Sequence, residues 1–249
     1  MKYPDFLKEI VVHIPILLRF LELTGIKRDA EIATFFKHIH KGQIVLDIGA
    51  NVGRFTKIFC MLVGEDGKVF AFEPVSINYN RLAKIGYKNL SIFKLAISNQ
   101  SGETAMFFPP ADGAQASMVK QTFGNWRDSV VIGEEKCEMA SLDGLMEVKK
   151  IPTPQFIKID VEGAELSVLL GAKKLLKDNN IILFLELNLE TLKSFGISIG
   201  EIWDLLQNYG YRVFTLVTRK TAFIVEGKED LVRGVELNFS PNLLCQKKS

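Results

Sequence analysis

Residues Asp47 to Gly53, with the sequence DIGANVG, constrain the fold of this chain more than any other segment. The short apolar run at residues 44–46 comes directly before them and predicts a buried strand. Apolar residues follow at helical spacing between Phe55 and Leu62. A strand, a glycine turn and a helix form the first unit of a nucleotide-binding α/β sheet.

The composition of this turn indicates which nucleotide it binds. Asn51 stands where the dinucleotide motif G-x-G-x-x-G would place its second glycine. Asp47 would repel a pyrophosphate, but it suits the ammonium and sulfonium groups of S-adenosylmethionine. Gly49, Ala50 and Gly53 would let a ligand approach the backbone, and the helix that follows presents free N–H groups. The alternative interpretation is an ordinary tight turn between a strand and a helix.

Composition narrows the class of protein. A chain of 249 residues fits one α/β domain with additions, and its net charge of +2 is too small to indicate a nucleic-acid partner. The three cysteines, Cys60, Cys137 and Cys245, are widely spaced, which is typical of reduced thiols in a cytoplasmic protein. No run reaches the about 18 apolar residues of a membrane span, so we expect no integral membrane segment.

Residues 1–41 are predicted to form an N-terminal helical cap, and residues 42–249 the sheet domain. Apolar residues recur at helical spacing over 5–24, where Pro15 interrupts the pattern, and again over 29–40. The cap could pack on the sheet domain, form a homodimer contact or touch a membrane surface. The histidines of this region form no recognisable metal-ligand pattern.

Strand and helix patterns alternate from residue 43 onward. Strands are predicted at 43–48, 68–72, 90–95, 155–160 and 181–187, and helices at 54–63, 76–85, 164–176 and 199–209. Short extra strands at 104–108 and 136–140 flank a long loop at 109–130. Strands at 211–217 and 221–225 read as a hairpin, which adds antiparallel pairing. This pattern predicts a doubly wound, mostly parallel, seven-stranded α/β sheet of the methyltransferase type rather than a dehydrogenase sheet.

Two strand ends on the cofactor side carry candidate binding residues. Glu73 ends the second strand and precedes Pro74. In doubly wound sheets, an acid at the end of this strand accepts hydrogen bonds from ribose hydroxyls. Ala96 and Ile97 end the third strand and could flank an adenine ring. The alternative for Glu73 is a solvated residue at a strand end.

The second strong motif is IKIDVEGAE, in which Lys158 interrupts a buried strand and three acids follow. Charge in a buried strand is costly without a partner or a function. Asp160 is best placed to face the sulfonium or the acceptor hydroxyl, with Glu162 next to it, and Glu186 ends the neighbouring strand. The alternative is that the acids cap helices and pair with Lys158.

The motifs DIGANVG, FEP, LAISN, SLDGL and KIDVEGAE occur in one order, and together they resemble the FkbM-type S-adenosylmethionine-dependent methyltransferases over about residues 43–226. The resemblance implies a class I methyltransferase fold and O-methylation of hydroxyls on sugars, glycans or natural products. It implies that Asp47, Gly49, Asn51 and Gly53 hold the methionine end of the cofactor and that Glu73 holds the ribose. The wording FEPVSIN departs from the usual FEPNPxN.

These patterns predict in-line methyl transfer to a small-molecule or glycan acceptor. Asp160 is the first candidate for the general base, and Glu162 and Lys158 are neighbours that could tune it. No metal is expected, because no histidine or cysteine accompanies the acids. We expect loop 109–130 and the N-terminal helices to form the acceptor side and residues 47–99 the cofactor side. The alternatives are an NAD-dependent oxidoreductase and a non-catalytic interaction module with the same fold.

Overall fold

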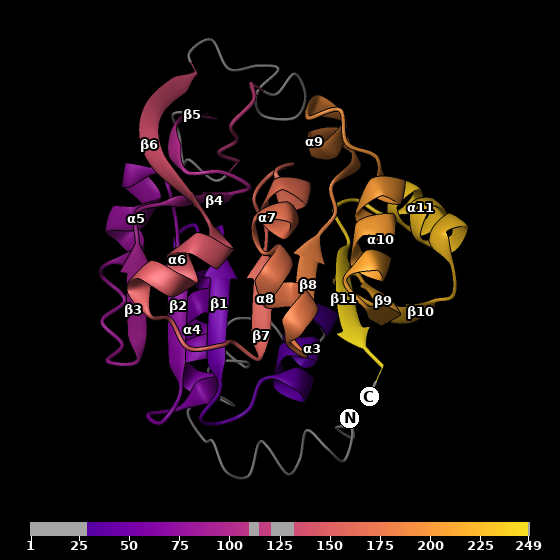
Figure 1. Ribbon diagram of the computed structural model, residues 1–249, viewed down its shortest axis with the longest axis horizontal. Helices are drawn as coiled ribbons and strands as arrows, with labels where there is room; N and C mark the ends of the chain where they lie inside the picture. The colour runs from indigo at the N-terminus through magenta and orange to yellow at the C-terminus, as the bar shows by residue number, and fades with distance from the viewer. Residues whose placement is uncertain (1–28, 110–114, 121–131, 249) are drawn as a thin grey trace.

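A central sheet of eight strands, with helices on both of its faces, forms the body of the molecule (Figure 1). The structure is a computed structural model that describes residues 29–109, 115–120 and 132–248. In spatial order the strands are β10 (Ala222–Val225), β9 (Tyr211–Val217), β11 (Asn242–Lys247), β8 (Ile182–Glu186), β7 (Phe156–Ile159), β1 (Ile44–Ile48), β2 (Lys68–Phe72) and β3 (Leu90–Phe93).

The sheet is parallel from β3 to β8, and β11 then pairs antiparallel with both β8 and β9. Strands β9 and β10 form the predicted hairpin, with Ala222 opposite Val217. The predicted class I fold is therefore confirmed, but the sheet has eight strands rather than seven. Sequence patterns missed β11, because its apolar core, Leu243 to Cys245, is too short to distinguish a strand from other buried segments.

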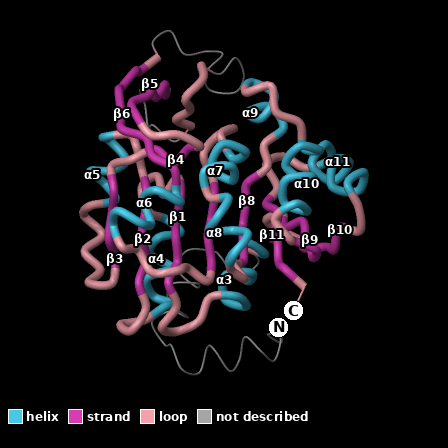
Figure 2. Tube along the Cα trace, viewed as in Figure 1, coloured by secondary structure: helices cyan, strands magenta, loops and turns pink. Residues whose placement is uncertain are grey.

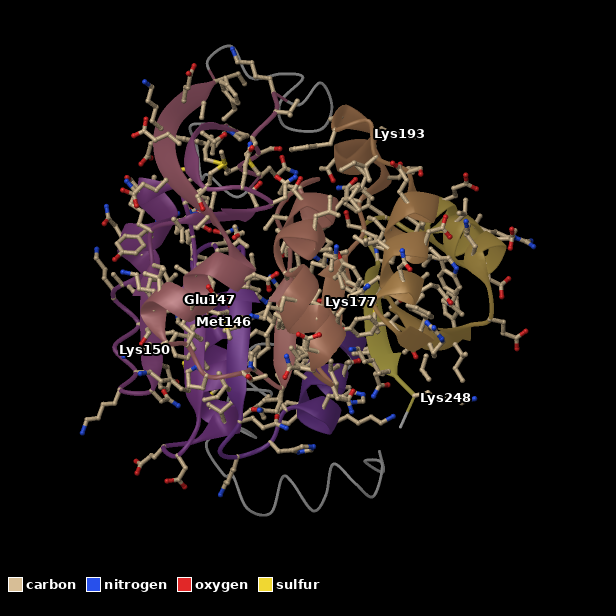
Figure 3. All side chains as sticks on the ribbon, in the orientation of Figure 1. Met146, Glu147, Lys150, Lys177, Lys193 and Lys248 are labelled. Carbon is tan, nitrogen blue, oxygen red and sulfur yellow. The ribbon has the colours of Figure 1, made fainter. Side chains whose placement is uncertain are left out.

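Helices cover the two faces of the sheet in separate layers. The face toward the viewer in Figure 1 carries α6 (Leu142–Lys149), α7 (Glu165–Gly171), α8 (Lys173–Asp178), α10 (Ile199–Asn208) and α11 (Lys228–Leu237). Glu147 on α6 and Lys177 on α8 lie on the outer surface of this layer, as amphipathic helices require (Figure 3). The single helix predicted over 164–176 is instead α7 and α8, which are separated at Ala172.

The opposite face carries α3 (Ala30–His38) and α4 (Arg54–Val63). Phe35 of α3 is fully buried, and its ring meets Phe59 of α4 and Phe184 of β8 edge to face, with centroids 4.9 Å apart in both pairs. The described part of the predicted cap therefore packs on the sheet. The helices predicted within residues 1–28, and the homodimer contact that they would make, lie outside the described residues, so the boundary at residue 41 stays a prediction.

A second, three-stranded sheet lies beyond the end of the main sheet where its parallel strands finish (Figure 2). Its strands are β4 (Ala96–Ser98), β6 (Gly133–Ser141) and β5 (Gly102–Phe108). Ala96 and Ile97 therefore belong to this small sheet, whereas β3 ends at Phe93. Two short helices, α5 (Ser76–Leu82) and α9 (Leu189–Ser194), complete the elements of this end. Among the described helices, none has the length and apolar character that a bilayer span requires.

Candidate active site

Two cavities lie at the carboxyl end of the parallel strands and share one wall. The first, which we call the cofactor cavity, lies among the ends of β1, β2 and β7 and the small sheet. It is lined by Gly49, Asn51, Glu73, Pro74, Ala96, Ile97, Asp160 and Glu162 from among the predicted site residues, and also by Asn78, Leu95, Met106, Met118 and Glu186. The structure therefore brings most of the predicted cofactor residues together.

Glu73 both lines this cavity and fixes the shape of the turn beside it. One carboxylate oxygen accepts from the backbone N–H of Asn51 at 2.8 Å, and the other accepts from that of Val75 at 3.0 Å. The side chain is buried, and burial raises its pKa to about 7 against the opposing effect of these hydrogen bonds. Glu73 therefore ties the turn after β1 to the end of β2.

The glycines of the turn serve protein packing directly. A Cβ atom on Gly49 would lie 1.7 Å from the backbone oxygen of Asp160, and one on Gly53 would lie 2.2 Å from Ile85 Cδ1. Both glycines also have left-handed backbone angles, which favour glycine. Neither Gly53 nor Ala50 is among the residues that line the cofactor cavity. Ala50 is buried instead in a small apolar cluster with Leu82.

Asp47 and Lys158 form a buried ionic network under the site. Lys158 Nζ lies 3.6 Å from Asp47 Oδ1 and 3.0 Å from Asp160 Oδ2, and the Thr56 hydroxyl donates to Asp47 Oδ2 at 2.6 Å. Burial raises the pKa of Asp47. Burial alone would lower the pKa of Lys158, but the two carboxylates keep it above its ordinary value. Asp47 is fully buried and is not among the residues that line the cofactor cavity, so its observed charged partner is Lys158.

Three acids form the wall that the two cavities share. Carboxylate oxygens of Asp160, Glu162 and Glu186 all lie within 4.8 Å of one another. Glu162 has a φ of +51°, a left-handed conformation that costs a non-glycine residue free energy and often marks a functional site. Burial and the neighbouring carboxylates raise the pKa of Glu162 to about 8, and they also raise that of Glu186. Glu162 and Glu186 therefore hold protons more readily than ordinary glutamate side chains.

Hard cations also prefer oxygen ligands of this kind. An acidic cluster does not by itself define a metal site, so metal-free transfer stays a prediction. Glu165 has a structural role, because its Oε1 accepts from the backbone N–H groups of Val161 and Gly163. For this residue the helix-capping interpretation describes the structure.

The second cavity, which we call the acceptor cavity, lies on the other side of the three acids and measures about 720 Å³. Besides the acids it is lined by Glu31, Arg54, Phe55, Gln115, Asn188, Thr218, Arg219, Lys220, Asn238, Phe239, Ser240 and Asn242. The turn at 218–220 and the segment 238–242 were missed in the sequence. One pattern in the sequence could have indicated this part of the cavity: the polar turn of the predicted hairpin follows β9, which ends at the same edge of the sheet as β8.

The sequence predicts that loop 109–130 lies on the acceptor side of the site, and the residues that line the two cavities agree with this prediction only in part. Gln115 contributes to the acceptor cavity, but Ala116 and Met118 of the same loop line the cofactor cavity. Residues 110–114 and 121–131 lie outside the described part of the chain. Glu31 of α3 also lines the acceptor cavity, as expected of a residue from the N-terminal region.

The cofactor cavity fits S-adenosylmethionine by the chemistry of its lining. Glu73 offers a carboxylate to ribose hydroxyls, and Leu95, Ile97 and Met106 offer apolar surface to an adenine ring. The three acids at the shared wall suit the cationic methionine end. Glu73 would therefore hold the ribose of this cofactor, and the three acids would hold its methionine end.

Comparison with known proteins gives the family. The model of the methyltransferase FkbM domain matches residues 47–213, which is more than half of the chain. The hexuronic acid methyltransferase AglP of Haloferax volcanii is 26% identical over 155 residues, which are 61% of this chain and 59% of AglP. The chain thus matches about three fifths of the length of this relative.

Two solved structures of methyltransferases each share 15% identity with the chain. Methyltransferase FkbM from Methylobacillus flagellatus KT has 15% identity and a TM-score of 0.49, covering 82% of this chain and 43% of that one. A SAM-dependent methyltransferase from Aquifex aeolicus has 15% identity and a TM-score of 0.48, covering 89% and 90%. Because the family model spans the glycine turn, Glu73 and the three acids, the chain belongs to the FkbM methyltransferase domain family, with S-adenosylmethionine as its cofactor.

Proposed function

We propose that this protein transfers the methyl group of S-adenosylmethionine to a hydroxyl group on a sugar-containing acceptor. The observation that carries the proposal is the shared wall, where Asp160, Glu162 and Glu186 border both cavities. A methyl donor in one cavity and a hydroxyl in the other would meet at these carboxylates. The name of the related hexuronic acid methyltransferase supports a sugar as the acceptor.

The cofactor supplies a methyl carbon activated by a positively charged sulfur. The acceptor oxygen forms a bond to this carbon as the carbon–sulfur bond breaks, and the hydroxyl proton must leave. Asp160 is the proposed base, because its carboxylate borders both cavities and lies 3.0 Å from the ammonium group of Lys158. The carboxyl oxygens of Glu162 and Glu186 lie within 4.8 Å of Asp160, so the three groups can exchange the proton that Asp160 takes up.

The alternative of an NAD-dependent oxidoreductase disagrees with the family to which the chain belongs. A non-catalytic module with the same fold would transfer no methyl group, so a measurement of methyl transfer distinguishes it from the proposed enzyme. The test is therefore to incubate the protein with methyl-labelled S-adenosylmethionine and a panel of neutral and acidic glycosides, and to measure labelled products by mass spectrometry.

Two variants test the proposed base and the proposed contact with the ribose separately. We expect Asp160→Asn to lower the rate of transfer by about 10²- to 10⁴-fold, as loss of a general base does, with cofactor still bound. We expect Glu73→Gln to weaken cofactor binding by about 1–3 kcal/mol, because the carboxylate that accepts from ribose becomes a neutral amide.

Glu236→Gln is the matched control, because Glu236 is exposed on α11 and lines neither cavity. Calorimetric titration with S-adenosylmethionine measures binding in each variant. Unchanged transfer by folded Asp160→Asn would show that Asp160 is not the base. Absence of labelled product with every acceptor would contradict the assignment of a sugar.

A further inference from the structure

The acceptor cavity has acidic side chains on one part of its lining and basic side chains on another. The three acids of the shared wall lie on one side, at the ends of β7 and β8. Three cations, which we call the basic end, come from other elements: Arg54 begins α4, and Arg219 and Lys220 lie in the turn between β9 and β10. A ligand that bridges the two parts would present a proton donor to one and a negative charge to the other.

We propose that the acceptor carries a carboxylate and that the basic end binds it while the reacting hydroxyl faces the acids. This inference rests on the proposed function and narrows it to an acidic acceptor. A guanidinium presents its N–H donors in a planar fork that matches a carboxylate, so Arg219 is the residue best suited to recognition.

The sheet register fixes how far apart the two parts are. Glu186 pairs with Asn242, and Asn242 pairs with Val217, so two strand spacings separate the end of β8 from the end of β9. Each spacing is about 4.8 Å, which gives about 10 Å across the sheet. Since β11 is antiparallel to both neighbours, β9 runs in the direction of β8, and the turn after Val217 lies at the same edge as Glu186.

The turn holds Arg219 and Lys220 in place without engaging their charges. Thr218 Oγ1 accepts from the backbone N–H groups of Lys220 and Thr221, and the backbone oxygen of Arg219 accepts from Ala30 N at 3.0 Å. Both basic side chains are exposed, and neither forms an ion pair within the described ranges. Burial raises the pKa of Glu31 and the nearby Arg219 opposes this rise, but the exposed guanidinium of Arg219 has no ion-pair partner within the described ranges and can still bind a ligand.

The remaining lining decides which anion fits. Arg54 is partly neutralised by Asp29 at 3.4 Å, and Glu31 accepts from Asn242 Nδ2 at 3.0 Å in a buried position. Any ionised carboxyl group in this lining repels a doubly charged phosphate more strongly than a singly charged carboxylate. Phe239, whose side chain is 87% exposed, offers an aromatic surface to the body of the ligand.

The test measures binding of three probes to the protein saturated with S-adenosylhomocysteine. Methyl glucuronoside carries a carboxylate, methyl glucoside is neutral, and glucose 6-phosphate carries a phosphate. We expect methyl glucuronoside to bind at least about tenfold more tightly than methyl glucoside in calorimetric titration at low salt. Arg219→Gln should abolish this preference and leave the affinity for methyl glucoside unchanged.

The matched control is Arg233→Gln, which removes the same charge from an exposed position on α11 that does not line the cavity. It should retain the preference. Equal affinity for the charged and neutral glycosides, no binding of methyl glucuronoside, or tighter binding of glucose 6-phosphate would each overturn the proposal. If S-adenosylhomocysteine itself does not bind, the proposed function fails, and the three probes still report the charge preference of the cofactor-free protein.

Discussion

Lys158 is the residue on which the electrostatics of the site depend. Its ammonium group is buried between Asp47 and Asp160, and it lies 5.5 Å from the centre of the Phe55 ring. Without it, Asp47 would be a fully buried carboxyl group whose remaining partner is the Thr56 hydroxyl. A single cation thus compensates both the structural acid and the proposed base.

We therefore expect Lys158→Met to lower the free energy of unfolding by about 3–5 kcal/mol, because breaking a buried ion pair leaves an uncompensated charge. Urea denaturation at neutral pH measures the change. Lys173→Met serves as the control, since Lys173 is exposed at the start of α8. A loss of stability no larger than that of the control would mean that Asp47 is neutral without Lys158.

The sequence showed which residues matter at this scale but not how they pair. Lys158 and Asp160 are two positions apart in one strand, so their proximity followed from the chain itself. The pairing of Lys158 with Asp47 depends on the register between β7 and β1, in which these two residues are direct neighbours. A register between distant segments is set by packing of the whole sheet, and no local pattern records it.

At the scale of elements, the contact between α7 and β4 connects the main sheet to the small one. A Cβ atom on Gly171 would lie 1.9 Å from the backbone oxygen of Ser98, so the helix and the strand meet backbone to backbone. β4 also supplies Ala96 and Ile97 to the cofactor cavity. The position of α7 thus determines where this part of the cavity wall lies.

Two glycine substitutions are expected to have opposite effects. Gly171→Ala should destabilise the protein by about 1–3 kcal/mol through overpacking and should weaken cofactor binding by displacing β4. Gly200→Ala in α10 should stabilise it by about 0.5–1 kcal/mol, because the nearest atom to the new Cβ is 3.6 Å away and alanine favours a helix. Thermal unfolding and calorimetric titration measure both. Normal cofactor affinity in Gly171→Ala would show that β4 does not position the cavity wall.

Periodic patterns located most individual elements but not the small sheet that β4 joins. Strand β2 and helix α4 have the bounds that the pattern indicated, because each has a full apolar face. Strand β4 has three residues and pairs with β6, more than thirty residues away along the chain. Such a pairing has no periodic signature of its own.

At the scale of the molecule, β11 holds the sheet together between β8 and β9. Its residues Leu243 and Cys245 are fully buried. Deletion of residues 241–249 should therefore abolish cooperative unfolding, because β8 and β9 would lose their shared partner. Removal of Lys248 and Ser249 alone should leave the urea transition unchanged. A cooperative transition in the longer deletion would show that β8 and β9 can pair directly.

The late position of β11 also bears on the synthesis of the protein. Ribosomes make chains from the amino terminus, so β8 and β9 are complete before β11 has been translated. During that interval two neighbouring strand edges are left without their partner, and unpaired edges of this kind invite association with other nascent chains. The parallel half of the sheet can form as it emerges, whereas the antiparallel half, which supplies the turn at 218–220 to the acceptor cavity, must wait for β11.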